Sequence, residues 1–376
     1  MSECESIGMD NAANGLRGVR ATPSARLLEL LRERYGLAGA GETRDLGGSS
    51  SLNLLITSGS GRYVARVYRP HVSEPRLKAM QRVRRELTRG GVPCAEVVPT
   101  RDGEMWAKID DRLVEVEPFV ERDGDMDSWE RLELGLPWLG RIHSLLRGVE
   151  TSPEGRIPLF ANHIEPSDTL ESTLRGTGRV RGWGPSPGEL RLIEAAEELA
   201  QRVADAEREI VASLPRQLVH GDFWDNNVFF RGGRVVLVTD LDFMGERARI
   251  DDLALTLYYT NSTFSEDPVS DDRIARLRRL VDAYDRGLDD PLSPIERAAL
   301  PLALARQPLW WVGRWLALLD DEEQARRGLA AMSWDIEWAL QIIRHAGRWQ
   351  AAFAERTEQP ATGASASRGS RTRRPR

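Results

Sequence analysis

Cysteine is nearly absent from the chain, which contains only Cys4 and Cys94 among its 376 residues. Two cysteines cannot build the disulfide framework that holds many small secreted domains together. Long apolar runs are absent as well, because none approaches the roughly 20 residues that a membrane-spanning helix needs. The first ten residues include Glu3, Glu5 and Asp10 and lack the basic and apolar regions of a signal peptide. We therefore expect a cytoplasmic protein with no membrane partner.

Length and composition predict a globular protein. With 41% hydrophobic and 29% charged residues, the chain can bury a sizeable core, and 376 residues are enough for two lobes. The two ends differ from the rest: residues 1–22 are predicted to be a disordered leader. Residues 356–376, rich in Arg, Ser, Ala and Gly, are predicted to be a disordered tail.

Charge is distributed unevenly along the chain. The net charge is −6, but residues 356–376 carry six Arg and one Glu, which leaves −11 on the remainder. An acidic body suits a cationic substrate and suits solubility equally well, so both interpretations stay open. The Arg-rich tail alone is weak support for a nucleic-acid role, and we do not expect a nucleic-acid partner. The sequence does not specify an oligomeric state.

The most informative segment is the 220–227 loop, His-Gly-Asp-Phe-Trp-Asp-Asn-Asn. Asp222 and Asn227 lie five positions apart on it, and Asp240 follows an apolar run at residues 235–238. This spacing is typical of phosphoryl-transfer sites, in which one carboxylate accepts the proton of the attacking hydroxyl and two oxygen ligands hold a metal ion. An acidic loop that is merely solvated would not need all three residues.

A hairpin is predicted to bring these groups together. The apolar runs 228–230 and 235–238 flank a Gly-Gly pair, which suits a tight turn. If Arg231 pairs with Arg234, Asn227 faces Val238, and Asp240 lies on the same side because side chains alternate with period two. Diagonal neighbours across two strands are about 7 Å apart, within reach of one or two Mg²⁺ ions.

These residues carry a family resemblance. His220-Gly221-Asp222, Asn227, Asp240 and Asp252-Leu253-Ala254 resemble the motifs of the aminoglycoside phosphotransferase and choline kinase family, which is related to protein kinases. The similarity extends over about residues 46–338 and is strongest over 218–254. It implies an α+β, two-lobed, protein-kinase-like fold with a small β-rich N-lobe (23–118), which binds nucleotide, and a larger, mainly helical C-lobe (119–355), which holds the catalytic and substrate-binding groups.

The resemblance also implies roles for individual residues. Asp222 would be the catalytic base, and Asn227 and Asp240 would hold Mg²⁺, with ATP or GTP as the co-substrate. Asp252 would anchor the 220–227 loop through hydrogen bonds. His143 and His220 are expected to be structural rather than to carry protons.

The nucleotide is expected to contact three segments of the N-lobe. Gly47-Gly48-Ser49 would form a phosphate-binding turn, because small residues let backbone N–H groups approach phosphate oxygens. Arg66 occupies the position at which the family usually has a phosphate-binding Lys, and it still supplies a permanent positive charge. Glu117 and Phe119 lie in the segment that resembles the hinge between the lobes, where backbone groups would bind the base.

The acidic partner of Arg66 is left open by the sequence. In the helix predicted over residues 75–89, Met80 stands where the family usually has Glu. Glu74 and Glu86 are the candidates, and neither is in convincing register.

Further along the chain, periodicity predicts helices at 24–36, 136–146 and 187–214, with Pro137 in the first turn of the second. Residues 148–188, rich in Gly, Pro and Ser, are expected to form a loop or small insertion over the substrate mouth. The tryptophans of residues 310–349 fit either an aromatic substrate wall or ordinary helical core. The acidic run 320–323 fits either attraction of an amine or a helix cap.

These observations predict a phosphotransferase that moves the nucleotide γ-phosphate to a hydroxyl of a small molecule by direct in-line transfer. Acidity and aromatic content favour an amine-bearing acceptor, such as an aminoglycoside or an amino alcohol. The alternative is a catalytically weak nucleotide-binding regulatory module, suggested by Arg66 and by the missing helical Glu.

Overall fold

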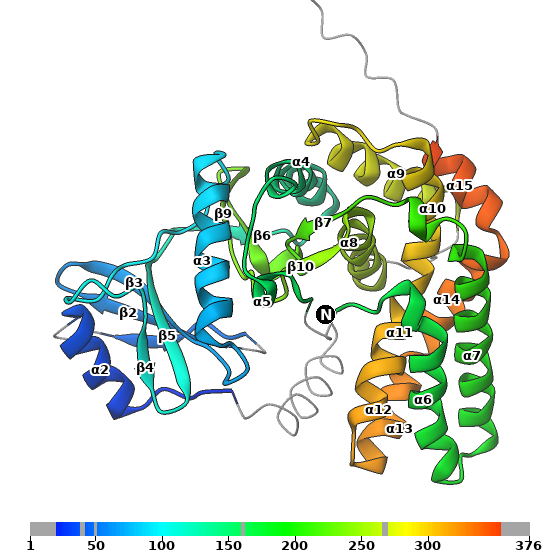
Figure 1. The fold of residues 1–376 in the computed structure, drawn as a ribbon, viewed down its shortest axis with the longest axis horizontal. Helices are drawn as coiled ribbons and strands as arrows, with labels where there is room; N and C mark the ends of the chain where they lie inside the picture. The colour runs from blue at the N-terminus through cyan, green and yellow to red at the C-terminus, as the bar shows by residue number, and fades with distance from the viewer. Residues whose placement is uncertain (1–19, 38–41, 49–50, 159–161, 265–269, 355–376) are drawn as a thin grey trace, which may run out of the picture.

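The computed structural model describes residues 20–37, 42–48, 51–158, 162–264 and 270–354. The predicted tail, 356–376, and residues 1–19 of the predicted leader lie outside this part of the chain. Within it, a sheet with two accompanying helices forms one lobe and a set of helices forms the other (Figure 1). The predicted α+β, two-lobed architecture is confirmed.

The N-lobe is a five-stranded antiparallel sheet with strand order β1-β2-β3-β5-β4. Side chains along each strand alternate between the two faces of this sheet, and the two faces have different surroundings. Ala65 and Val67 of β3 pack into a buried cluster with Leu27 and Leu31 of α2, whereas Arg66 belongs to the opposite face. The elements of this lobe are α2 (Ala25–Tyr35), β1 (Thr43–Asp45), β2 (Leu52–Ser58), β3 (Gly61–Val67), α3 (Glu74–Arg89), β4 (Ala107–Ile109) and β5 (Arg112–Pro118).

The lobe begins earlier than predicted. Ser24 caps α2, because its hydroxyl accepts the Leu27 N–H, and Gly36 ends the helix at φ 73°, as the sequence indicates. Arg20, however, lies in the segment predicted to be a disordered leader, and its guanidinium donates to both carboxylate oxygens of Asp45 at 2.7 and 2.9 Å. The boundary expected after residue 22 is therefore too late.

The C-lobe surrounds two small antiparallel sheets, β7 with β10 and the three-stranded β6-β8-β9. Its strands are β6 (Gly124–Asp125), β7 (Arg216–Val219), β8 (Val228–Arg231), β9 (Arg234–Val238) and β10 (Gly245–Ala248). Its helices are α4 (Trp129–Leu146), α5 (Pro153–Arg156), α6 (Thr169–Gly182), α7 (Pro187–Glu207), α8 (Arg249–Phe264), α9 (Asp271–Arg286), α10 (Pro294–Arg306), α11 (Pro308–Trp310), a π-helix (Trp311–Trp315), α12 (Leu316–Leu318), α13 (Glu322–Ala331), α14 (Ser333–Arg344) and α15 (Ala346–Ala354).

Two predicted helix boundaries in this lobe are wrong, and one region has more regular structure than a loop. Helix α4 starts at Trp129, capped by Ser128, so Pro137 lies inside the helix rather than in its first turn. Helix α7 ends at Glu207, and a short 3₁₀ turn over residues 211–213 replaces its predicted last turns. The region 148–188, expected to be a loop or small insertion, contains the helices α5 and α6. Helix α6 packs so closely on the π-helix that a Cβ at Gly176 would lie 1.9 Å from the Val312 carbonyl oxygen.

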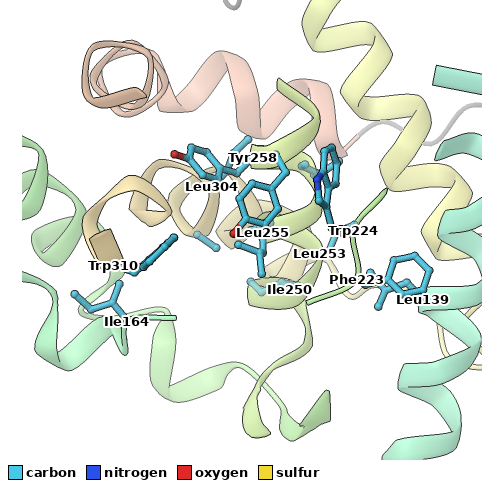
Figure 2. Close-up of a cluster of buried hydrophobic side chains, with 14 of the residues drawn as sticks. Leu139, Ile164, Phe223, Trp224, Ile250, Leu253, Leu255, Tyr258, Leu304 and Trp310 are labelled. Atoms are coloured by element: carbon cyan, nitrogen blue, oxygen red, sulfur yellow. The ribbon is translucent and has the colours of Figure 1, made fainter. Parts of the chain in front are cut away.

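The tryptophans are mostly core. Trp310, Trp311, Trp315, Trp338 and Trp349 are all at most 9% exposed, and only Trp334 among the six, at 40%, faces solvent. Figure 2 shows part of this core, in which Phe223 and Trp224 of the 220–227 loop belong to the same buried cluster as Leu139 of α4 and side chains of α8. The acidic run acts as a cap, since the Asp321 carboxylate accepts the Gln324 N–H at the start of α13. No helix in the described ranges is long and apolar enough to cross a membrane.

A buried carboxylate joins three helices to the 220–227 loop. Both oxygens of Asp252, on α8, accept the Gly221 N–H at 3.1 Å, and His143 of α4 lies 3.0 Å from one of them. The other ring nitrogen of His143 contacts the Tyr284 hydroxyl of α9 at 2.8 Å. Burial opposes ionisation of Asp252, but His143 and the charge of Arg247 outweigh it and hold its pKa at about 2. The predicted structural roles of Asp252 and His143 are confirmed.

Helix α4 approaches α9 too closely for a side chain at Gly140, where a Cβ would lie 2.3 Å from the Tyr284 carbonyl oxygen. We expect Gly140→Ala to lower the free energy of unfolding by about 1–3 kcal/mol through overpacking, measured by urea denaturation. Gly178→Ala is the matched control, because the same change in α6 meets no atom within 4 Å. Alanine favours a helix, so the control should be neutral or slightly stabilising. Equal effects of the two substitutions would contradict the close packing.

Asp252→Asn should lower the free energy of unfolding by about 3 kcal/mol, the usual cost of breaking a buried charged network. The amide keeps one acceptor oxygen, but it removes the negative charge and sets an NH₂ group in place of the second oxygen that Gly221 N–H now contacts. Asp271→Asn is a suitable control, because Asp271 is an exposed carboxylate paired with Arg348 at the surface. Urea unfolding of Asp252→Asn that matches this control would show that the network does not hold the fold.

Candidate functional site

Side chains from both lobes line a cleft next to the 220–227 loop. Every predicted site residue that the structure describes lies on its wall; Ser49 falls outside the described residues. The lining includes Gly47, Gly48, Arg66, Glu117, Phe119, Asp222, Asn227 and Asp240. Residues as far apart in the sequence as Gly47 and Asp240 thus line one cleft.

The backbone around Asp222 is fixed by its neighbours. Gly221 has φ 85°, and a Cβ there would lie 2.1 Å from the Phe243 carbonyl oxygen, so only glycine fits. His220 is fully buried, and burial lowers its pKa, which keeps the ring neutral. Its Nδ1 accepts the Asp222 N–H at 3.3 Å, so its Nε2 carries the proton and donates to the Thr239 carbonyl at 3.0 Å. His220 therefore ties the loop to the chain after β9, as its predicted structural role requires.

Two amides hold the Asp222 carboxylate. Asn227 Nδ2 donates to Oδ2 and Asn162 Nδ2 donates to Oδ1, both at 2.9 Å. Burial and the nearby charge of Asp240 raise the Asp222 pKa well above its usual range, although the bond from Asn227 acts the other way. Burial is the larger cause of the raised pKa, and a bound cation would offset the part that comes from the charge of Asp240.

The hairpin register differs from the prediction by one residue. Arg231 pairs with Arg234 as expected, but a bulge between Phe229 and Phe230 places Val228, not Asn227, opposite Val238. Asn227 instead ends a 3₁₀ turn, and its carbonyl accepts the Thr239 N–H. Asp240 lies beyond the end of β9 and has φ 66°. Non-glycine residues adopt this backbone conformation mainly where function or packing requires it.

Arg66 finds its acidic partner in the C-lobe. Its guanidinium lies 3.2 Å from Asp240 Oδ2 and donates to the Thr239 hydroxyl at 3.0 Å. Neither candidate on α3 reaches it, because Glu74 pairs with Lys108 and Glu86 with Arg89. The side chain is only 5% exposed, so Arg66 is not a surface residue of the strand.

Helix α3 presents a cation, Arg84, to carboxylates of β5, one turn after Met80. Arg84 donates to Glu115 at 2.7 Å and lies 3.6 Å from Glu117, and Gln81 donates to the other oxygen of Glu115 at 2.7 Å. Burial raises the pKa of Glu117 despite the nearby charges of Arg84 and Arg66. Arg84 was not singled out from the sequence, because its role depends on which face α3 turns to β5.

The donor atoms fit a divalent cation. Asn227 uses its amide nitrogen on Asp222, so its amide oxygen is the atom available to a metal ion beside the carboxylate of Asp240. The nearby Asp242 is 1% exposed, and its Oδ1 has no hydrogen-bond partner. In the described ranges no three His, Cys, Asp or Glu side chains form a metal-binding group. A cation here would therefore need further oxygens from phosphate and water, as Mg²⁺ commonly does.

The second amide on Asp222 was missed from the sequence. Asn162 lies in the 148–188 region, which was expected to be a loop or small insertion, and it has φ 59°. Its side-chain oxygen accepts the Tyr259 hydroxyl at 3.1 Å. An isolated Asn-His pair carries no recognisable signal, and no spacing relative to the 220–227 loop could have indicated it.

The chain is similar in sequence to two homoserine kinases. The homoserine kinase of Parvibaculum lavamentivorans is 27% identical over 270 residues, covering 69% of this chain and 74% of that protein. The homoserine kinase of Caulobacter vibrioides is 26% identical over 271 residues, covering 69% and 75%.

Solved structures share the fold at low identity. Amicoumacin kinase, in complex with AMP-PNP and Ca²⁺, superposes with a TM-score of 0.62 at 14% identity over 86% of this chain and 94% of that one. A microcompartment-associated aminopropanol kinase superposes with a TM-score of 0.58 at 17% identity over 88% and 98%. The model of the phosphotransferase enzyme family matches residues 42–289, more than half of the sequence and both lobes. The chain therefore belongs to the phosphotransferase enzyme family.

Proposed function

We propose that this protein transfers the γ-phosphoryl group of ATP or GTP, bound with Mg²⁺, to a hydroxyl of a small amine-bearing molecule. The observation that carries the proposal is the convergence of Asp222, Asn227 and Asp240 in one cleft with Arg66. Phosphoryl transfer needs mainly positioning and neutralisation of charge, and this set supplies both. Direct in-line transfer requires no phospho-enzyme.

Each group has a role in this proposal. Asp222 accepts the proton of the attacking hydroxyl, and its two amide partners hold the carboxylate in place. The Asn227 amide oxygen and the Asp240 carboxylate would hold Mg²⁺, which would neutralise charge on the phosphates. Arg66 and the backbone at Gly47 and Gly48 lie on the same cleft wall and would receive the phosphates.

The adenine or guanine of the nucleotide would lie against Glu117 and Phe119, which line the cleft and belong to the segment that resembles a hinge. Glu117 belongs to β5 and Phe119 directly follows it, where the chain leaves the N-lobe.

An amine-bearing acceptor is supported by two observations. Two partly buried carboxylates lie near the cleft: burial raises the pKa of both Asp125 and Asp225, although Arg122 opposes this at Asp125, which is on the cleft wall. An ammonium group would compensate this charge. The relatives named above act on homoserine, amicoumacin and aminopropanol by their names, and we extend that class to this protein.

The test is Mg²⁺-dependent release of ADP or GDP with a panel of amino alcohols, including homoserine and aminopropanol, together with aminoglycosides and sugars. We expect turnover with an amine-bearing acceptor and at least a 100-fold loss of kcat in Asp222→Asn, the usual scale for removing a general base. Nucleotide affinity should be retained. Tight nucleotide binding without product from any acceptor would favour the regulatory module instead.

Arg66→Gln should weaken binding of Mg-AMP-PNP by about 10- to 100-fold, because charge-assisted hydrogen bonds to phosphate are worth about 1.5–3 kcal/mol. Arg66→Lys is the matched variant: it keeps the charge but loses the fork that reaches both Asp240 and Thr239. Its affinity should fall between those of the wild type and Arg66→Gln. Isothermal titration calorimetry measures all three, and an unchanged dissociation constant in Arg66→Gln would remove Arg66 from the phosphate site.

A further inference from the structure

Asn162 has no place in the motifs of the chain, yet it makes a direct contact with the proposed base. Its Nδ2 donates to Asp222 Oδ1 at 2.9 Å, while Asn227 serves Oδ2 at the same distance. The residue is 8% exposed, so water competes little for this bond. The two amides come from separate parts of the chain and bind opposite oxygens of one carboxylate.

The amide of Asn162 has a defined orientation. The Tyr259 hydroxyl donates to its Oδ1 at 3.1 Å, which leaves the NH₂ group for Asp222. A reversed amide would set its oxygen against the carboxylate and its NH₂ group against the hydroxyl. Tyr259 is itself held on α8, with its ring 5.3 Å from that of Trp224.

The backbone of Asn162 is specified as well. Its φ of 59° lies in the left-handed region, which asparagine, aspartate and glycine tolerate better than other residues. The Arg247 guanidinium donates to its carbonyl oxygen at 3.4 Å. Residue type, backbone conformation and side-chain orientation thus all agree with presentation of an amide to Asp222.

We propose that Asn162 is a positioning residue for Asp222, which rests on the proposed function above. A carboxylate has about four lone-pair sites. One amide on each oxygen fixes the plane of the group and leaves the remaining lone pairs for the acceptor hydroxyl. The Asp222 oxygen that accepts the proton of that hydroxyl is then already oriented before the reaction. Tyr259 contributes to this orientation by holding the Asn162 amide.

The test compares two substitutions that tolerate the left-handed backbone. Asn162→Asp keeps the shape and replaces the donor by an acceptor, and Asn162→Gly removes the side chain. Both should lower kcat by about 10- to 100-fold, the scale of misplacing a reacting group, with little change in KM for the nucleotide. The acceptor is the one that the panel identifies, or water, as slow Mg-ATP hydrolysis, where the panel identifies none.

Tyr259→Phe provides the independent arm. It should lower kcat by a smaller factor, and it should add nothing to Asn162→Gly, because both act on one chain of hydrogen bonds. Tyr258→Phe, the same change at the neighbouring position of α8, is the control and should leave kcat unchanged. In a crystal structure of Asn162→Gly, the Asp222 carboxylate should be rotated or occupy two conformations.

The outcomes separate the inference from the function on which it rests. If Asp222→Asn abolishes turnover while folded Asn162 variants keep kcat within twofold, the inference is wrong and the function stands. If Asp222→Asn retains full turnover, the proposed function fails first. A loss of kcat in Asn162→Gly that is matched by a fall in melting temperature, with Asp222 unmoved in the crystal, would assign Asn162 a purely structural role.

Discussion

The buried carboxylate of Asp252 is the contact on which the site depends. It receives the Gly221 N–H and lies against His143, which in turn contacts Tyr284, so a single charge fastens the 220–227 loop to α8, α4 and α9. A charge without solvent is stable only when such partners are complete. The loop can therefore place Asp222 reproducibly although it has little regular structure of its own, because its conformation is imposed by the helices beneath it.

Local signals in the sequence were sufficient for much of this structure. Ser24 and Gly36 bound α2 because caps act within a few residues, and the Gly-Gly turn set the start of the β8–β9 hairpin correctly. The predictions failed where distant packing decides. The bulge after Phe229 shifted Asn227 by one position, and α6 is helical despite its glycines. The partner of Arg66 and the role of Asn162 depend on contacts more than 50 residues away in sequence, which spacing alone cannot specify.

Charges from the two lobes meet in the cleft. Arg66 of the N-lobe lies on Asp240 of the C-lobe, the carboxylate that would hold a metal ion under the proposed function. The Arg66 guanidinium and a divalent cation would compete for the Asp240 carboxylate. Binding of the nucleotide with its metal ion would then replace Arg66 by the metal ion at this carboxylate. Behind them, Arg84 lies against the carboxylates of β5, including Glu117 on the cleft wall.

Helix α8 holds the site at two points. Asp252 and Tyr259 lie seven residues apart on it, two turns or about 10 Å along the axis, and they therefore face the same side. The first fixes the backbone where the 220–227 loop begins, and the second orients the amide that meets the Asp222 carboxylate. Because both contacts come from one rigid helix, a small movement of α8 would move the 220–227 loop and the Asn162 amide together. Their geometry relative to each other would then be preserved.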